Sequence, residues 1–120
     1  MTEPQIRPAV IEDIPELLRM IRELAEFEKL TDQVVATEED YQESLFGEKP
    51  AAEALICEVD HSIVGYAIFF STFSTFIGRA GIWLEDIYIR PAHRTQGIGT
   101  KLLKAVGKIA EERNAGRYEW

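Results

Sequence analysis

The sequence predicts an α/β fold of the α+β kind, in which a mixed, mostly antiparallel sheet is flanked by helices. Three β-type runs follow one another closely in the middle of the chain, and amphipathic helical patterns stand on either side of them. With 120 residues, 46% of them hydrophobic, the chain is long enough for one core and too short for two ordinary domains. A single domain over residues 1–120 is therefore expected.

The first third of the chain contains a short strand pattern and two helix starts. Residues 5–9 form the strand pattern, and residues 13–16 (Asp-Ile-Pro-Glu) supply an N-cap, a first-turn proline and a reciprocal carboxylate. Apolar residues then recur every three or four positions through about Phe27, which predicts one amphipathic helix. Residues 37–40 (Thr-Glu-Glu-Asp) form a second capping box, and its helix should stop at Gly47.

The β-type runs occupy the centre of the sequence. Residues 54–59 and 63–73 are separated by the turn-forming segment 60–62, so they should form a hairpin. The third run, 80–89, is followed closely by Pro91, which has no N–H to donate to a ladder. Three neighbouring antiparallel strands are the simplest interpretation.

A last helix should follow these strands. Apolar residues recur at helical spacing from Ile98 to Ala110, and residues 114–116 (Asn-Ala-Gly) predict its end. Residues 117–120 (Arg-Tyr-Glu-Trp) have the pattern of a strand that has just begun.

Charge and hydropathy exclude several classes of partner. The 13 Lys and Arg against 21 Asp and Glu give a net charge of −8, which argues against nucleic acid and fits a small cationic substrate. The longest apolar stretches fall well short of the roughly 20 residues of a membrane span, so a soluble protein is expected. Met1 is not followed by a basic segment and an apolar run, which predicts a cytoplasmic location.

The cysteine and histidine content gives no sign of a metal site. Cys57 is the only cysteine, so an internal disulfide and a thiolate zinc site are excluded. It lies in an apolar run, where a buried core position is favoured over a catalytic thiol. His61 and His93 lie in turn-forming segments without a second ligand at helical or hairpin spacing. No metal is therefore expected.

The strongest functional pattern is the loop 94–99 (Arg-Thr-Gln-Gly-Ile-Gly), between the third β-type run and the last helix. Backbone N–H groups at a helix start attract anions, and Gly97 and Gly99 let the backbone approach a pyrophosphate. A plain glycine-rich turn remains the alternative. A nucleotide P-loop is excluded because Thr100-Lys101 stands in the wrong order, and a dinucleotide fingerprint lacks its third glycine at Leu102.

This loop resembles the coenzyme A motif of the GNAT N-acetyltransferase superfamily, Arg/Gln-x-x-Gly-x-Gly/Ala. Residues 17–34 are similar to the first helix of the diamine acetyltransferases, and most similar to the thialysine-type members. Residues 83–89 (Trp-Leu-Glu-Asp-Ile-Tyr-Ile) resemble the central strand of that family. Because the three matches occur in the expected order, the chain is identified as a member of the diamine and thialysine branch.

The resemblance implies an acyl-CoA N-acyltransferase fold and direct transfer of an acetyl group from acetyl-CoA to a primary amine. The substrate would be a small polyamine, a diamine or a thialysine-like or lysine-like amine, and no metal would take part. The strand would hydrogen-bond the pantetheine through its backbone, and the loop would hold the pyrophosphate. The cofactor-binding residues expected on this basis are Ile87, Tyr88, Ile89, Arg94, Thr95, Gln96, Gly97, Ile98, Gly99 and Thr100.

Glu85 and Asp86 are candidates for the chemistry of the amine. An alkyl amine with a pKa of about 10.4 is almost wholly charged at neutral pH, so a carboxylate would help to deprotonate it. Neighbours on a strand leave opposite faces, so at most one of the two should point into a given site. The resemblance implies Glu85 as the catalytic carboxylate, and Phe27 and Glu28 as substrate-binding residues. A polar strand end and a solvated helix end are the alternatives.

The resemblance also predicts an incomplete fold and a partner. Members of the family continue the strand begun at Arg117 with a helix, whose tyrosine protonates the leaving thiolate, and with further strands. The chain is expected to lack these elements, and neither Tyr88 nor Tyr118 stands in that tyrosine's motif position. The alternative function is therefore a non-catalytic acyl-CoA-binding or assembly module. Complete relatives are typically dimers, so a homodimer is expected.

Overall fold

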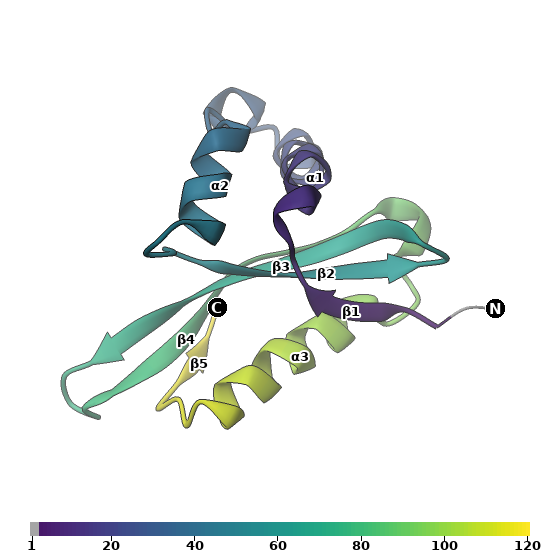
Figure 1. Ribbon diagram of the computed structural model, residues 1–120. Helices are drawn as coiled ribbons and strands as arrows, with labels where there is room; N and C mark the ends of the chain where they lie inside the picture. Colours follow the sequence, from purple (N-terminus) through teal and green to yellow (C-terminus); the bar gives the residue numbers. More distant parts are fainter. Residues whose placement is uncertain (1–2) are drawn as a thin grey trace.

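The computed structural model describes residues 3–120 and shows one sheet with helices on both faces (Figure 1). The strands are β1 (Gln5–Pro8), β2 (Glu53–Val59), β3 (Ser62–Ser74), β4 (Arg79–Ile89) and β5 (Tyr118–Glu119). The helices are α1 (Ile14–Phe27), α2 (Glu38–Phe46) and α3 (Ile98–Glu112), with short 3-10 turns η1 (Ile11–Asp13), η2 (Thr31–Gln33) and η3 (Pro91–His93). In Figure 1, α1 and α2 cover one face of the sheet and α3 lies on the other.

The sheet is mixed and mostly antiparallel, as predicted. Its strand order is β1-β2-β3-β4-β5; the first three pairings are antiparallel and β4 pairs with β5 in parallel. The β2–β3 hairpin turns at Asp60 and His61, both of which have positive φ angles (51° and 66°). Two central residues of positive φ make the twist of a two-residue turn match that of the flanking strands. The predicted hairpin is therefore confirmed.

Two apolar cores lie on the two faces. The core under α3 includes Cys57, whose thiol pKa is raised by burial, so its prediction as a core residue is confirmed. The main side chains of this core are Leu55, Phe69, Ile82, Leu84, Ile98, Leu102 and Val106. The core under α1 and α2 includes Leu17, Met20, Ile21, Leu45, Ile56, Tyr66 and Tyr88. None of the helices in the described part of the chain is long and apolar enough to cross a membrane.

One predicted capping box forms and the other does not. At α2 the Thr37 hydroxyl accepts a hydrogen bond from the Asp40 N–H (3.2 Å) and the Asp40 carboxylate accepts one from the Thr37 N–H (2.8 Å). At α1 the helix begins as predicted, with Asp13 at the N-cap position and Pro15 in the first turn, but the Asp13 side chain makes no capping hydrogen bond. The Asp13 carboxylate accepts hydrogen bonds from the Arg7 guanidinium (2.7 and 2.9 Å) and the Val10 N–H (2.7 Å). An arginine from β1 binds a carboxylate more strongly than one backbone N–H does.

Candidate active site

A pocket of about 350 Å³ lies between the C-terminal half of α1 and β4. It is lined by Ile21, Leu24, Ala25, Glu28, Leu30, Gln33, Val34, Glu85 and Asp86. The structure thus brings together Glu28 and Glu85, two of the predicted substrate residues, and adds a third carboxylate. Within residues 3–120 no group of three or more acidic, His or Cys side chains has an arrangement that could hold a metal ion.

A β-bulge places Glu85 and Asp86 in the same pocket. Ile68 of β3 pairs with Asp86, but the next residue, Phe69, pairs with Leu84, so Glu85 is the extra residue. The bulge reverses the alternation of β4 from that point on. Leu84 therefore faces the core under α3, and so does Ile87, three residues later. The prediction that Glu85 and Asp86 leave opposite faces is wrong.

The two carboxylates of the bulge differ in environment. Glu85 is exposed and accepts a hydrogen bond from the Trp83 indole N–H (3.2 Å). Asp86 is half-buried, and burial, followed by the negative charges of Glu85 and Glu28, raises the pKa of its carboxyl. The buried Tyr66 hydroxyl lies near Asp86 but has no partner in hydrogen-bond geometry among the described residues. Ionisation of Asp86 is therefore less favourable in the folded protein, and a bound cation would make it more favourable.

Sequence reasoning considered Asp86 but did not place it in the same pocket as Glu85, although a signal was present. The apolar residues of this strand that face α3 are Ile82, Leu84, Ile87 and Ile89, at spacings of two, three and two. A spacing of three inside a strand indicates a bulge.

Phe27 has a different setting from the one predicted. Its ring is 70% exposed, and the Arg94 guanidinium lies over it, 5.3 Å from the ring centroid. The same guanidinium lies 5.5 Å from the ring centroid of Tyr88, and its Nε donates to the Ile89 carbonyl (2.8 Å). Arg94 therefore lies between the end of α1 and the end of β4, between the loop and the pocket that Glu28, Glu85 and Asp86 line.

The loop before α3 has the geometry of an anion cradle. Gly97 is the N-cap of this 15-residue helix and has a φ of +76°, which favours glycine. A Cβ built at Gly97 or at Gly99 has no described atom within 4 Å, so both backbone faces are open. Thr95, Gln96 and Thr100 are exposed around them. The first N–H groups of a helix have no partner within the helix and point outward to an anion.

Ile98 differs from its neighbours in this loop. Its side chain is buried in the core under α3, so only its backbone could face a ligand. The buried side chain instead fixes the helix start on the sheet.

The free edge of β4 leads from the pocket between α1 and β4 to this loop. β5 pairs with β4 only at Ile82 and Trp83, so β5 leaves the later residues of that edge unpaired. The Arg90 N–H donates to the Val64 carbonyl of β3 (2.8 Å). Hydrogen-bonded pairs alternate in an antiparallel ladder, so the backbone groups of Tyr88 also face β3. Of the three predicted pantetheine contacts, Ile87 and Ile89 have backbone groups on the free edge and Tyr88 does not.

An apolar pocket of about 390 Å³ lies along this edge, lined by Leu84, Ile87, Gly99, Thr100, Leu103 and Trp120. It brings the strand and the cradle into one groove. A groove with apolar walls, open backbone donors and an anion cradle at one end fits a coenzyme that carries a long thiol arm and a pyrophosphate. The residues present therefore fit coenzyme A.

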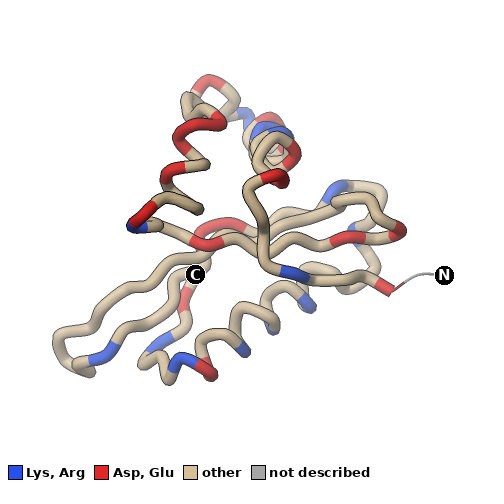
Figure 2. The backbone as a smooth tube through the Cα atoms, viewed as in Figure 1, with Lys and Arg blue, Asp and Glu red and all other residues tan. Residues whose placement is uncertain are grey.

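Charge is distributed differently on the two faces of the sheet. Figure 2 shows acidic residues concentrated on α2, acidic and basic residues together on α1, and basic residues along α3 with acidic residues at its end. The acidic residues of α2 are Glu38, Glu39, Asp40 and Glu43, and the lysines of α3 are Lys101, Lys104 and Lys108. A cation would be attracted to the first face and a polyanion to the second.

Comparison with known proteins agrees with this geometry. The model of the acetyltransferase (GNAT) family matches residues 16–120. The chain belongs to the GNAT family and is an N-acetyltransferase, as the sequence predicted.

Individual relatives show how far the similarity extends. The chain is 40% identical over 126 residues to the thialysine N-epsilon-acetyltransferase of Mus musculus, covering 98% of this chain and 74% of that protein. It is 36% identical over 113 residues to the human spermidine/spermine N(1)-acetyltransferase-like protein 1, covering 88% of this chain and 16% of that protein. Among solved structures it is similar to the ribosomal-protein-alanine N-acetyltransferase of Brucella melitensis biovar Abortus 2308, with a TM-score of 0.77, 26% identity and coverage of 98% and 78%.

Proposed function

We propose that this protein transfers an acetyl group directly from acetyl-CoA to a primary amine of a small diamine, polyamine or thialysine-like or lysine-like substrate. The observation that carries the proposal is the bulge of β4, which turns Glu85 and Asp86 together toward Glu28 in one pocket. Three carboxylates in a small pocket favour a molecule with more than one positive charge. The names of the mouse and human relatives, one for thialysine and one for spermidine and spermine, support the same substrate class.

Glu85 is the proposed proton acceptor. Acetyl-CoA, when bound, would supply the thioester whose carbonyl carbon the amine attacks, so that a C–N bond would form as the C–S bond breaks and coenzyme A leaves as a thiolate, which takes up through water the last proton that the nitrogen releases. The amine nitrogen must first lose a proton, and the exposed Glu85 carboxylate is available to take it, directly or through water. Asp86 is more buried than Glu85. Its negative charge would lie beside either the second ammonium of the substrate or the reacting amine.

Glu28 would bind the distal ammonium of the substrate. It lies at the C-terminal end of α1, on the opposite wall of the pocket from Glu85 and Asp86. The spacing between these walls would therefore select the length of the amine. Phe27, with Arg94 over its ring, would close the side of the pocket that is nearest to the loop.

The groove along β4 and the cradle before α3 would hold the coenzyme. Backbone N–H groups fixed in advance on the free edge would stabilise the negative charge that develops on the thioester oxygen. The loop residues from Thr95 to Thr100 would bind the pyrophosphate, with charge from Arg94 and Lys101 nearby. The predicted homodimer and cytoplasmic location stay predictions.

The function is tested by acetylation of diamines and thialysine with acetyl-CoA, with Glu85→Gln and the matched control Glu26→Gln. Glu26 is an exposed glutamate of α1 outside the pocket lining. We expect Glu85→Gln to lower kcat/KM by about 100-fold at pH 7, with a smaller loss toward pH 9, where more free amine is present. A full rate for Glu85→Gln from pH 7 to 9 would remove Glu85 from this role. Coenzyme binding without acetylation of any amine would favour a non-catalytic binding module.

A further inference from the structure

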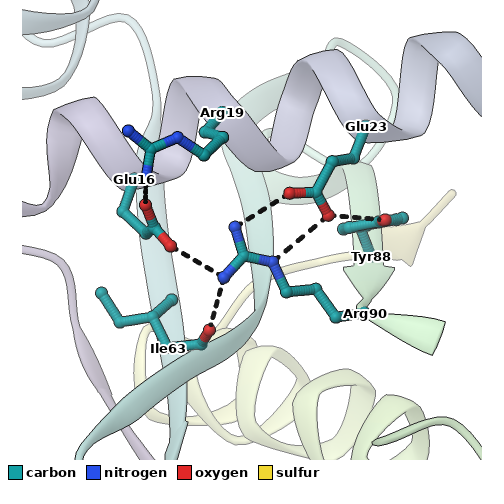
Figure 3. A network of polar contacts seen from close by, with 6 residues as sticks. All are labelled: Glu16, Arg19, Glu23, Ile63, Tyr88 and Arg90. Carbon is teal, nitrogen blue, oxygen red and sulfur yellow. Dashed lines mark hydrogen bonds and ion pairs between the residues drawn. The ribbon is translucent and has the colours of Figure 1, made fainter. Parts of the chain in front are cut away.

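One arginine joins α1 to the sheet at two turns of the helix (Figure 3). Arg90 follows β4 directly, and its guanidinium is enclosed by α1 above and β3 below. Nε and Nη2 donate to the two carboxylate oxygens of Glu23 (3.2 and 2.9 Å). Nη1 donates to Glu16 (2.7 Å) and to the Ile63 carbonyl (3.0 Å). Four hydrogen bonds from one side chain thus connect α1, β3 and β4.

A second strand residue reinforces this contact. The Tyr88 hydroxyl donates to the same Glu23 carboxylate (3.0 Å), and Figure 3 shows Tyr88 and Arg90 approaching it from the sheet. Burial alone would raise the pKa of Glu23, but the hydrogen bonds from Arg90 and Tyr88 outweigh it, and the pKa of this carboxyl is lowered. The carboxylate therefore stays charged and bound to the arginine near neutral pH.

The arrangement fixes α1 along its own axis. Glu16 and Glu23 are seven residues apart, about 10.5 Å along a helix, and the guanidinium lies between them. The apolar stripe of α1 is buried in the core below it, but burial is non-directional and resists sliding weakly. A two-point contact between a planar guanidinium and a carboxylate has a fixed geometry and resists it.

The axial position of α1 matters to the pocket because the two walls belong to these two elements. Glu28 follows α1 directly, whereas Glu85 and Asp86 lie on β4, the strand that ends at Arg90. A slip of α1 along its axis would move Glu28 relative to the bulge carboxylates and so change the shape of the pocket.

We propose that Arg90 is a positioning residue that holds α1 in register with β4 and thereby sets the length of amine that the pocket accepts. The inference rests on the proposed function for its substrate, but its geometric part concerns α1 alone. It assigns no contact between Arg90 and the substrate, because the guanidinium is bound by Glu16, Glu23 and Ile63.

The test compares Arg90→Met, which keeps an apolar stem of similar length, with Arg19→Met. Arg19 also pairs with Glu16, but its side chain is 68% exposed and belongs to α1 itself, so it does not join the helix to the sheet. The readouts are KM and kcat over a series of α,ω-diamines of increasing length, and calorimetric affinity for coenzyme A.

We expect Arg90→Met to raise KM for the preferred diamine about tenfold and to flatten the dependence on chain length, because small misplacements of binding groups are costly. Coenzyme affinity should stay within about twofold of the wild type, because the coenzyme would bind in a separate groove that Arg90 does not line. Arg19→Met should match the wild type. If the Arg90 contacts serve stability alone, Arg90→Met will lower the melting temperature and leave the dependence of KM on chain length unchanged. That result would overturn the proposal.

A second variant and a second measurement keep the proposal testable if Arg90→Met does not fold or if no amine is acetylated. Glu23→Gln keeps the shape of the side chain and removes the charge, and it should flatten the profile in the same way. Hydrogen exchange should become faster in α1 of this variant and stay unchanged in α3. Unchanged exchange in α1 would overturn the positioning role. Faster exchange in α1 of a protein that acetylates no amine would support the role of Arg90 in holding α1 and would reject the proposed function.

Discussion

The two faces of the sheet differ in how buried the charged contacts are that join their helices to the strands. Under α3 the core is almost wholly aliphatic, with Phe69 and Cys57 among Leu, Ile and Val side chains. Under α1 and α2 the core contains Tyr66 and Tyr88, and the helix is joined to the sheet by charged hydrogen bonds from Arg90. Both faces bury apolar side chains, but their charged contacts differ in burial: the Arg90 side chain is 23% exposed, whereas Arg113 at the end of α3 and its partner Glu53 of β2 are each 44% exposed.

The difference matches what each face would bind. In the proposed function the coenzyme would meet the α3 face mainly through backbone groups, so the start of α3 would have only to be rigid. The amine would meet side-chain carboxylates from two separate elements, so the relative position of those elements would have to be fixed. The comparison predicts that substitutions on one face change the affinity for one ligand and leave the other affinity unchanged.

The largest effect should come from Gly97→Val on the α3 face. Valine is strained at a φ of +76° and its side chain would fill the open face of the cradle. We expect coenzyme A affinity, measured by calorimetry, to fall by more than about 30-fold.

Gly78→Val is the matched control for Gly97→Val. Gly78 has a φ of +75°, and a Cβ there also meets no described atom within 4 Å, but it lies in the β3–β4 turn. It should lose a comparable amount of stability and keep the coenzyme affinity. Equal affinities for Gly97→Val and the wild type would remove the cradle assignment.

A smaller effect, on the opposite face, is expected from Asp86→Asn. Loss of this charge should raise KM for the amine on the order of tenfold and leave coenzyme affinity unchanged. Stability should change in the other direction. The folded-state pKa of Asp86 lies above its ordinary value near 3.8, so the ionised carboxylate costs stability at neutral pH. Asp86→Asn should therefore be more stable than the wild type at pH 7.

That gain in stability has a defined pH dependence. It should be complete above the folded-state pKa of Asp86 and disappear as the pH falls below 3.8, where the carboxyl becomes protonated in both states. Denaturant unfolding at pH 7 and pH 4 measures it. A gain that grows in acid would contradict the raised pKa.

The smallest effect is expected from Thr95→Gly, within the cradle. Thr95 has a φ of +28°, a region in which a β-branched residue is strained. Relief of the strain is partly offset by the flexibility of glycine in the unfolded chain, so the net gain should be about 1 kcal/mol or less. Thermal unfolding measures the gain.

Asn114→Gly, at a φ of +55°, should gain less than Thr95→Gly because asparagine tolerates this region. A larger gain at Asn114 than at Thr95 would refute the assignment of strain.

The local patterns of the sequence were sufficient for the elements and for the cradle. Helical spacing of apolar residues, the capping box at Thr37 and the hairpin turn at residues 60–62 depend on neighbours in the chain, and all three are confirmed. The glycines of the loop are a local pattern too: the structure places Gly97 at the start of α3 with a positive φ, and the binding of a pyrophosphate there stays a prediction.

Tertiary structure alone decided how the pocket is assembled. The apolar spacing of three between Leu84 and Ile87 indicates a bulge, but the register of β3 against β4 decides that Glu85 is the extra residue, and strict alternation along β4 therefore placed Asp86 on the wrong face. The Arg90 contacts join residues 67 and 74 positions apart, and Asp13 is bound by Arg7 of β1 instead of capping α1. Charged side chains choose among partners by proximity in the folded molecule, and no local rule of spacing contains that information.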